Sequence, residues 1–310
     1  MDYVTFGRTN LNVSVMGLGC GGPSRIGQST GSDEAESVRI IRSAIDAGVN
    51  FLDTAEAYNT EEIVGKALQG LARDQIVIST KKSYRKEISP QLVREGVEAS
   101  LQRLQTDYID IYSLHGVFPE DYPMLRDEIL PTFRDLRDEG KIRFIGVTEM
   151  FNEDKTHQML IDSLLDDVWD VAMIGFNILN QTAREKVFPA TIEKNVAVQI
   201  MFAVRRALSQ PDKLRESIKT LIDAGQLEPE DVEMDNLLSF VLKESDATSL
   251  VDAAYRFCRY EPGVHVVLSG TGNPAHLQSN IDSLCKPPLP EPVVAKLRHI
   301  FRHASEVTGQ

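Results

Sequence analysis

The sequence predicts a (β/α)8 TIM barrel, and three observations lead to this fold class. Short β-rich segments alternate with longer amphipathic ones, the pattern of a parallel sheet with helical crossovers. The length of 310 residues suits one barrel with additions. Chemically active side chains stand at three consecutive strand ends, which in such a barrel meet on one face. We therefore expect a single barrel domain over 1–310, with an N-terminal hairpin plug, an insertion after the seventh strand and a C-terminal helix.

A small hairpin is expected first, over Val4–Val15 around Gly7 and Asn10, where it would plug the bottom of the barrel. Eight short strands follow it. In chain order they are predicted at Val15–Gly19, Asn50–Leu52, Ile76–Thr80, Tyr108–Leu114, Ile142–Val147, Val168–Phe176, Val196–Met201 and Val264–Leu268.

Helices are expected in the gaps, and Ser32-Asp33 and Ser89-Pro90 are typical of helix starts. The helices between strands are predicted at 33–47, 60–71, 90–104, 124–139, 153–165, 184–194, 212–224 and 274–283. Ala203–Ala247 is too long for a simple loop, so we expect extra helices there, over the top of the barrel or along its side. A further helix is predicted at 249–259, and a terminal one starts at Glu291.

Composition and charge argue against several classes of protein. The net charge of -13 argues against a nucleic-acid or anionic-membrane partner. Cys20, Cys258 and Cys285 have no metal-ligand spacing and suit a reducing compartment, and the six histidines are scattered. The start has no basic region followed by an apolar run, and no apolar stretch approaches the roughly 20 residues that span a bilayer. We expect a cytoplasmic protein without a bound metal.

Four side chains form the candidate site. Asp53 ends one strand candidate, Tyr58 lies in the following loop, and Lys81 and His115 end the next two strands. Carbonyl reduction needs a hydride from one side and a proton at the oxygen, which tyrosine can donate. The ordinary tyrosine pKa of about 10 is high for this, and the ammonium of Lys81 would lower the pKa. Asp53 would keep the lysine charged, and His115 would hydrogen-bond the carbonyl oxygen.

Each of these residues also has a structural interpretation when taken alone. Asp53 and Thr54 could cap a helix, Tyr58 could be a half-buried aromatic and Lys81 a solvated charge. Their joint occurrence at three consecutive strand ends favours catalysis. Lys82 follows Lys81, but strand alternation points it to the other side of the sheet.

The order Asp, Tyr, Lys, His at these places resembles the aldo-keto reductase family, and further blocks extend the resemblance over nearly the whole chain. These blocks are Phe6–Ser14 with Met16–Gly22, Glu61–Leu68, Leu104–His115, Gly140–Thr148 and Ser269–Asn280. The resemblance implies Tyr58 as the acid/base of the tetrad and NADP or NAD as the cofactor. It also implies cofactor contacts from strand-end loops, at Gly19, Thr148, Glu149, Met201, Ser269, Gly270, Thr271, Gly272, Asn273 and Asn280.

The chain departs from the family's usual pattern at the nicotinamide end. Thr148 and Glu149 stand where the family has Ser-Asn, and Met173 stands where it has a glutamine. Glu149 would accept a hydrogen bond from the carboxamide NH2, since an ionised carboxylate is an acceptor. The seventh-strand loop, often Ser-Pro-Leu in the family, is Phe202–Arg206 here. We expect a nicotinamide clamp made of different side chains.

The choice between NADP and NAD depends on basic side chains. No Lys or Arg occurs between Val264 and Cys285. Backbone N–H groups at the helix start after Asn273 can bind an anion. Arg205 and Arg206 are candidates for the pyrophosphate or a 2′-phosphate, with solvated surface arginines as the alternative.

We expect a nicotinamide-dinucleotide-dependent oxidoreductase that interconverts a carbonyl and an alcohol, with an aldehyde, a ketone or a sugar as substrate. A cofactor-binding regulatory subunit with little turnover is the alternative on the same fold. A barrel lyase or hydrolase would need two acidic residues or a metal at the strand ends, where only Asp53 stands. The loops Pro23–Gly31 and Gly116–Pro123 and the tail would determine the substrate, and the oligomeric state is left open.

Overall fold

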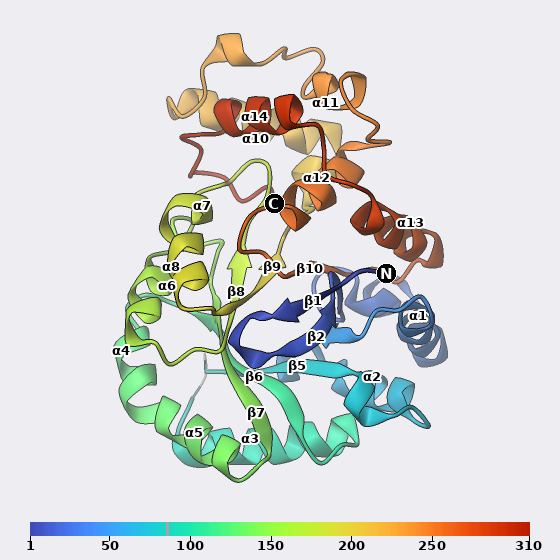
Figure 1. Ribbon diagram of the computed structural model, residues 1–310, viewed down its shortest axis with the longest axis vertical. Helices are drawn as coiled ribbons and strands as arrows, with labels where there is room; N and C mark the ends of the chain where they lie inside the picture. Colours follow the sequence, from blue (N-terminus) through green and yellow to red (C-terminus); the bar gives the residue numbers. More distant parts are fainter. Residues whose placement is uncertain (85–86) are drawn as a thin grey trace.

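The computed structural model describes residues 1–84 and 87–310, and its centre is a closed barrel of parallel strands. The strands follow one another in chain order from β3 to β10, and β10 pairs with β3 (Figure 1). They are β3 Met16–Gly19, β4 Phe51–Asp53, β5 Val77–Ser83, β6 Ile109–Val117, β7 Ile142–Glu149, β8 Val171–Gly175, β9 Ala197–Met201 and β10 Val266–Ser269. The predicted barrel and all eight of its strands are confirmed.

Two of the strands run further than expected. The ladder between β5 and β6 continues to the pairs Lys81 with Ser113 and Ser83 with His115. Lys81 and His115 therefore lie inside their strands instead of just beyond them. Because the neighbouring strand fixes the backbone there, the alternation of the sheet determines where both side chains point.

The predicted hairpin is present as the antiparallel pair β1 (Tyr3–Phe6) and β2 (Leu11–Ser14). Phe6 and Val13 are fully buried against inward-facing apolar residues near the strand starts, namely Phe51, Val77, Ile111, Val171, Ala197 and Val266. In Figure 1 the hairpin lies in dark blue across the barrel strands. It plugs the N-terminal end of the barrel, which leaves the C-terminal strand ends for a site.

The helices lie around the strands in Figure 1. The main ones are α1 Glu34–Asp46, α2 Glu61–Leu68, α3 Pro90–Leu104, α5 Leu130–Asp138, α6 Gln158–Ser163, α7 Ala183–Lys186, α8 Phe188–Glu193, α10 Pro211–Asp223, α12 Leu250–Arg259, α13 Pro274–Cys285 and α14 Glu291–Ile300. The start signals act as expected. Asp33 and Glu36 form a reciprocal capping box on α1, and the Ser89 hydroxyl accepts the N–H of Leu92 at the start of α3.

Three predicted helices differ in detail. The helix expected at 124–139 is α4 (Tyr122–Met124), a π-helical turn and then α5, with Pro131 in the first turn of α5. The one expected at 184–194 is divided into α7 and α8 just before Pro189. Proline lacks the N–H that a helix interior needs, so both interruptions have a local cause. The helix expected from 153 begins at Gln158, because the Asp154 carboxylate accepts the first N–H groups.

The insertion after β9 contains the expected extra helices, α9 (Arg206–Ser209), α10 and α11 (Ser239–Lys243). In Figure 1 α10, α11 and α14 form a group beyond α12, at the opposite end of the molecule from α3 and α5. The insertion and the terminal helix thus form an extra layer to one side of the barrel.

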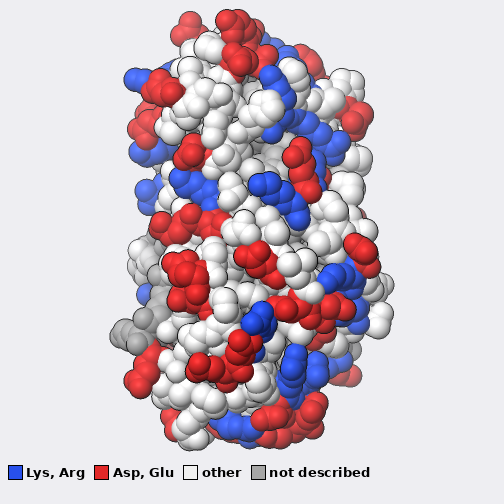
Figure 2. All heavy atoms as spheres, turned by 90° about the vertical axis from the view of Figure 1, so that its left-hand side faces the viewer, with Lys and Arg blue, Asp and Glu red and all other residues white. Residues whose placement is uncertain are grey.

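Acidic and basic side chains are mixed on the face shown in Figure 2. In the described part of the chain, no helix has the length and apolar composition to cross a membrane. The cytoplasmic location, the single-domain organisation and the absence of a nucleic-acid partner stay predictions.

Candidate active site

The four predicted side chains lie together at the C-terminal end of the barrel. Phe51, at the start of β4, faces the barrel interior, so Asp53, two residues later, faces it too. Lys81 lies four residues after the inward-facing Val77 on β5, and His115 lies four residues after the inward-facing Ile111 on β6. Both side chains therefore face the barrel interior as well. Tyr58 ends a short 3-10 turn, Glu56–Tyr58, in the loop after β4.

Lys81 is fully buried and paired with Asp53. Its Nζ lies 2.7 Å from both carboxylate oxygens of Asp53 and 2.6 Å from the carbonyl oxygen of Thr54. Burial alone would lower the pKa of Lys81, but Asp53 and Tyr58 outweigh it and raise the pKa. Burial raises the pKa of Asp53, and Lys81 opposes that shift. The lysine therefore stays an ammonium, and the three hydrogen bonds fix its position.

Tyr58 is in contact with His115. The Tyr58 hydroxyl lies 3.1 Å from Nε2 of His115, and the two rings are perpendicular with centroids 5.3 Å apart. Nζ of Lys81 lies 5.3 Å from the centroid of the Tyr58 ring. A proton donor, a hydrogen-bonding imidazole and a fixed positive charge are thus within one small volume.

The pKa of Tyr58 departs from the expectation. Burial raises the pKa, Lys81 lowers it and Asp53 raises it, and the net shift is upward. The predicted effect of Lys81 has the right sign, but the expectation of a lowered pKa was wrong because enclosure of the phenol outweighs the ammonium. A raised pKa keeps Tyr58 protonated at neutral pH, which is the form that donates a proton.

A cleft of about 770 Å³ opens beside these residues and includes Asp53 and Tyr58 in its lining. The rest of the lining comes from the loop after β3, the ends of β8, β9 and β10, the insertion, α12 and α13. These residues are Gly19, Gly21, Gly22, Pro23, Ser24, Met173, Met201, Phe202, Val204, Ser209, Val251, Tyr255, Leu268, Gly270, Thr271, His276, Ser279 and Asn280. Five predicted cofactor residues are among them: Gly19, Met201, Gly270, Thr271 and Asn280.

Three other predicted cofactor residues support the cleft without lining it. The Ser269 hydroxyl accepts from Asn280 and from the hydroxyl of Tyr255, both at 2.9 Å. Gly272 packs against the backbone of Gly27, where an added Cβ would come within 2.1 Å of the Gly27 Cα. Asn273 caps α13 by accepting two N–H groups at its start. Those two N–H groups are already paired, so the anion site expected there is filled by the protein itself.

Glu149 does not face the cleft, which corrects the expectation that it holds the carboxamide. Its side chain is completely buried, and its oxygens lie 2.8 and 3.0 Å from Nδ1 of His157. One oxygen also accepts the N–H of Gly175 at 2.8 Å. The neighbouring Thr148 is buried as well, and its hydroxyl accepts the N–H of Gly116 at 2.7 Å. No helix or strand spacing indicates this pairing, since His157 stands eight residues after Glu149, at the end of the segment between β7 and α6.

Arg205 also turns away from the cleft. Its Nη1 donates to Asn152 and to the Thr308 hydroxyl, each at 2.6 Å, and its guanidinium lies 3.4 Å from the centroid of Phe202. Burial lowers its pKa to about 10. Arg205 is therefore not the solvated surface arginine of the alternative interpretation: its contacts tie down the C-terminal tail, and it is not among the residues that line the cleft. Arg206 is exposed at the start of α9 and does not line the cleft.

Some cleft residues were missed at the level of sequence, although helical spacing could have found them. His276 and Asn280 are four residues apart on α13, and Val251 and Tyr255 are four apart on α12. Residues at this spacing share one helix face. Asn280 was predicted, so a helical reading of α13 would have added His276.

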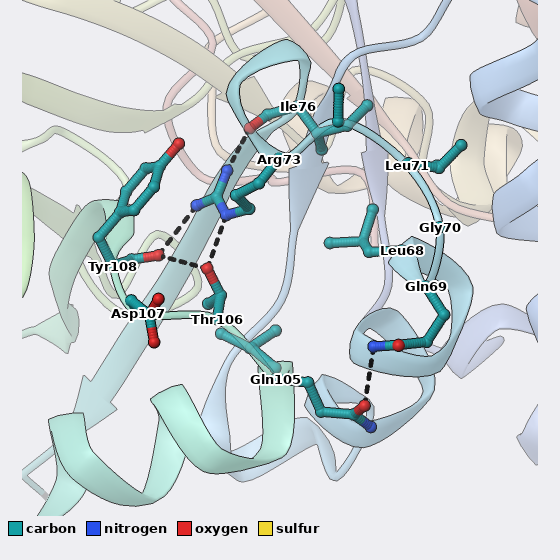
Figure 3. Close-up of a pocket in the computed structure, with 12 residues that line it drawn as sticks. Leu68, Gln69, Gly70, Leu71, Arg73, Ile76, Gln105, Thr106, Asp107 and Tyr108 are labelled. Atoms are coloured by element: carbon teal, nitrogen blue, oxygen red, sulfur yellow. Dashed lines mark hydrogen bonds between the residues drawn. The ribbon is translucent and has the colours of Figure 1, made fainter.

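Another pocket, of about 360 Å³, lies at the N-terminal ends of β5 and β6. Figure 3 shows Arg73 reaching from one side of it to the carbonyl oxygens of Ile76 and Tyr108 and to Thr106. Arg73 also pairs with Asp110. The guanidinium is engaged in holding loops together, so this pocket has a structural explanation.

No cluster of three or more His, Cys, Asp or Glu residues that could hold a metal occurs in residues 1–84 and 87–310.

A closed (β/α)8 barrel with a tyrosine, a lysine, a carboxylate and a histidine gathered beside one long cleft is typical of barrel oxidoreductases. Sequence comparison identifies the family: the model of the aldo/keto reductase family matches residues 16–302, and the chain belongs to this family.

Relatives and solved structures agree with this assignment. The chain is 29% identical over 301 residues to the aldo-keto reductase YhdN of Bacillus subtilis, covering 90% of this chain and 87% of that protein. It is 32% identical over 234 residues to the NADH-specific methylglyoxal reductase of Escherichia coli, covering 67% and 69%. The holo form of aldo-keto reductase AKR11C1 from Bacillus halodurans superimposes with a TM-score of 0.73 at 28% identity, covering 99% and 97%. The protein is a nicotinamide-dependent oxidoreductase that interconverts a carbonyl and an alcohol.

Proposed function

We propose that Tyr58 is the general acid and base of this reaction, with Asp53, Lys81 and His115 as the other members of its tetrad. The observation that carries the proposal is the 3.1 Å contact between the Tyr58 hydroxyl and His115, beside a buried ammonium. Tyr58 donates a proton to the carbonyl oxygen during reduction and accepts it back during oxidation. The bound nicotinamide supplies or takes up the hydride.

The other three residues prepare this proton transfer. His115 orients the substrate oxygen through Nε2, on the same side as the phenol. Lys81 stabilises the phenolate left after the proton has moved, by Coulombic attraction, since its hydrogen bonds all go to Asp53 and Thr54. Asp53 holds Lys81 in place, and Ser79 donates to Asp53 at 3.0 Å.

The cleft fits a dinucleotide cofactor. Its volume of about 770 Å³ lies within the usual range of cofactor sites, roughly 300–1,000 Å³. Gly19 and Gly270 approach so closely that a Cβ at Gly270 would lie 2.7 Å from the Gly19 carbonyl oxygen, so backbone groups form part of the wall. On barrel strands β6 and β9, outside the cleft lining, the hydroxyl of Ser113 and the amide of Gln199 are buried and have no hydrogen-bond partner within the described residues. Unpartnered polar groups of this kind are suited to water or to a polar ligand.

We propose that Gly19, Met201, Gly270, Thr271 and Asn280 contact the cofactor, and that NAD and NADP are discriminated only weakly. No Lys or Arg lines the cleft among the described residues, and His276 is its one basic side chain. A charge-assisted hydrogen bond contributes about 1.5–3 kcal/mol, which is roughly 10–100-fold in affinity. Without such a bond, the dissociation constants of NADH and NADPH are expected to differ by less than about tenfold.

Fluorescence titration with both reduced cofactors measures this preference directly. Arg205→Ala should leave the ratio of the two dissociation constants unchanged, because that guanidinium is buried on Asn152 and Thr308. Arg206→Ala tests the other arginine that the sequence suggested for phosphate binding. A strong NADPH preference that survives both substitutions would show that the 2′-phosphate site lies elsewhere.

For the substrate, we propose a small uncharged aldehyde or ketone. The cleft that includes Tyr58 is also lined by Met173, Met201 and Phe202, and no Lys or Arg among residues 1–84 and 87–310 lines it to neutralise a substrate carboxylate. The relation to a methylglyoxal reductase agrees with a small carbonyl compound. The sugar-oxidising direction remains the second candidate, since a relative is named an L-galactose dehydrogenase, at 35% identity over 157 residues.

A turnover assay tests the proposal. Purified protein with NADH or NADPH and a panel of small aldehydes, ketones and aldoses should oxidise the cofactor in the presence of at least one aldehyde or ketone. If the reduced cofactor were oxidised only in the presence of charged carbonyl compounds, the proposed substrate class would be contradicted.

A further inference from the structure

The loop after β3 holds Tyr58 at two points. Nε of Arg25 donates to the backbone carbonyl oxygen of Tyr58 at 2.9 Å, and Nη2 of Arg25 donates to the same oxygen. Gly21 lies directly against the phenol ring, since a Cβ added there would come within 2.4 Å of two ring carbons. The N–H of Arg25 donates to the carbonyl of Gly21, so both contacts belong to one turn of chain.

The same loop also forms a wall of the cofactor cleft. Gly21, Gly22, Pro23 and Ser24 line the cleft immediately before Arg25. Just after Arg25, the backbone of Gly27 packs against Gly272, in the loop that follows β10. A ligand in the cleft therefore contacts the segment Gly21–Ser24, and the next residue, Arg25, binds the backbone of Tyr58.

The backbone at this point is strained. Arg25 and Ile26 have φ of 46° and 52°, and Gly27 has φ of 96°. The left-handed region is rare for residues with a side chain and is costly for a β-branched one such as Ile26. The conformation is held by burial of Ile26 and by the hydroxyl of Ser37, which donates to the Ile26 carbonyl at 2.9 Å. Strain retained in this way is a common feature of functional loops.

We infer that Arg25 is a positioning residue for Tyr58, which couples the cofactor-binding loop to the proton donor. Tyr58 ends a turn of only three residues, so its own backbone hydrogen bonds fix it weakly. The planar guanidinium supplies two donors to a single oxygen and sets the position from which the ring extends to His115. The inference rests on the proposed role of Tyr58 as the acid and base.

A double-mutant cycle between Arg25→Ala and Tyr58→Phe tests the inference. Arg25→Ala is expected to lower kcat about tenfold or more, because small displacements of a catalytic group are costly. In the Tyr58→Phe background, the same change should lower the residual single-turnover rate less than about twofold, because no phenol is left to position. Arg25→Lys, which keeps the charge but lacks the planar fork, should recover only part of kcat.

The matched control is Arg42→Ala. Arg42 is half-buried like Arg25 and also donates to a backbone carbonyl, that of Gln69, but it lies on α1 away from the cleft. The Arg42→Ala substitution should leave kcat unchanged both in the wild-type protein and in the Tyr58→Phe variant. If Arg25→Ala does not fold, as judged by circular dichroism, Arg25→Lys and Arg25→Gln take its place in the cycle.

Equal, multiplicative losses in the two backgrounds would overturn the inference, since Arg25 would then act independently of the phenol. An unchanged kcat in the Arg25 variants would overturn it as well. If Tyr58→Phe alone kept full turnover, the proposed role of Tyr58 would fail, and this result is separate from either outcome for Arg25.

Discussion

Tyr58→Phe is expected to lower turnover by about 10²–10⁴-fold while leaving the dissociation constant of the cofactor nearly unchanged. The substitution removes only the hydroxyl that lies 3.1 Å from Nε2 of His115. The ring remains, so it can still pack on Gly21 and keep its perpendicular contact with His115. What is lost is the hydroxyl that donates the proton to the carbonyl oxygen.

Single-turnover kinetics should be used to measure the effect, because product release can otherwise hide a change in the chemical step. Fluorescence titration of the same variant checks that the cofactor still binds. Retention of more than about a tenth of wild-type turnover would exclude Tyr58 as the proton donor, given the usual size of general acid–base catalysis. Tyr3→Phe is a suitable control, because its hydroxyl binds the Gly48 carbonyl and lies in the N-terminal hairpin.

Lys81→Met is expected to lower the rate at neutral pH on the order of 10²-fold and to move the pH profile of alcohol oxidation upward. In that direction Tyr58 must be a phenolate to accept the alcohol proton, so the rate rises with pH through the pKa of Tyr58. Burial already raises this pKa, and Lys81 lowers it. Removing the ammonium therefore raises the pKa further, and the rising limb of the profile shifts to higher pH.

The Lys81 variant also disturbs a buried ion pair. Loss of one partner from such a pair usually costs about 3–5 kcal/mol of stability, since the other charge is left without compensation. Thermal unfolding should therefore be measured beside the rates. Lys81→Arg keeps a positive charge, and its profile should shift less than that of Lys81→Met. An unchanged profile in Lys81→Met, with a folded protein, would leave Lys81 a purely structural partner of Asp53.

Much of the fold could be predicted because barrel strands and helices carry local patterns. Each strand is a short apolar segment, and helices such as α3 have both a cap at Ser89 and an apolar face. The observed elements differ from the predicted ones where a proline or a neighbouring strand outweighs the apolar pattern. Pro131 and Pro189 interrupt helices that the apolar spacing continues, and β5 and β6 gain length from pairing with each other.

The gathering of the proposed catalytic side chains was predictable for the same reason. Asp53, Lys81 and His115 belong to strands, so the alternation of the sheet and the closure of the barrel bring them to one place. The cofactor half was predicted only in part: Gly19, Met201, Gly270, Thr271 and Asn280 line the cleft, whereas Glu149 and Arg205 have other partners. Glu149 pairs with His157 across an irregular segment of the chain, and Arg205 reaches Thr308 over 103 residues, so neither pairing follows a helix or strand period.

The barrel, its hairpin plug, the positions of the catalytic candidates and the family could all be predicted without the structure. Periodicity and residue type decide these properties within a few neighbouring residues. The three-dimensional arrangement was needed to find the net direction of the Tyr58 pKa, the partners of Glu149 and Arg205, and the contact of Arg25 with the Tyr58 carbonyl. Burial and hydrogen bonding depend on which distant segments meet, and a side chain with several available partners takes the one that folding places beside it.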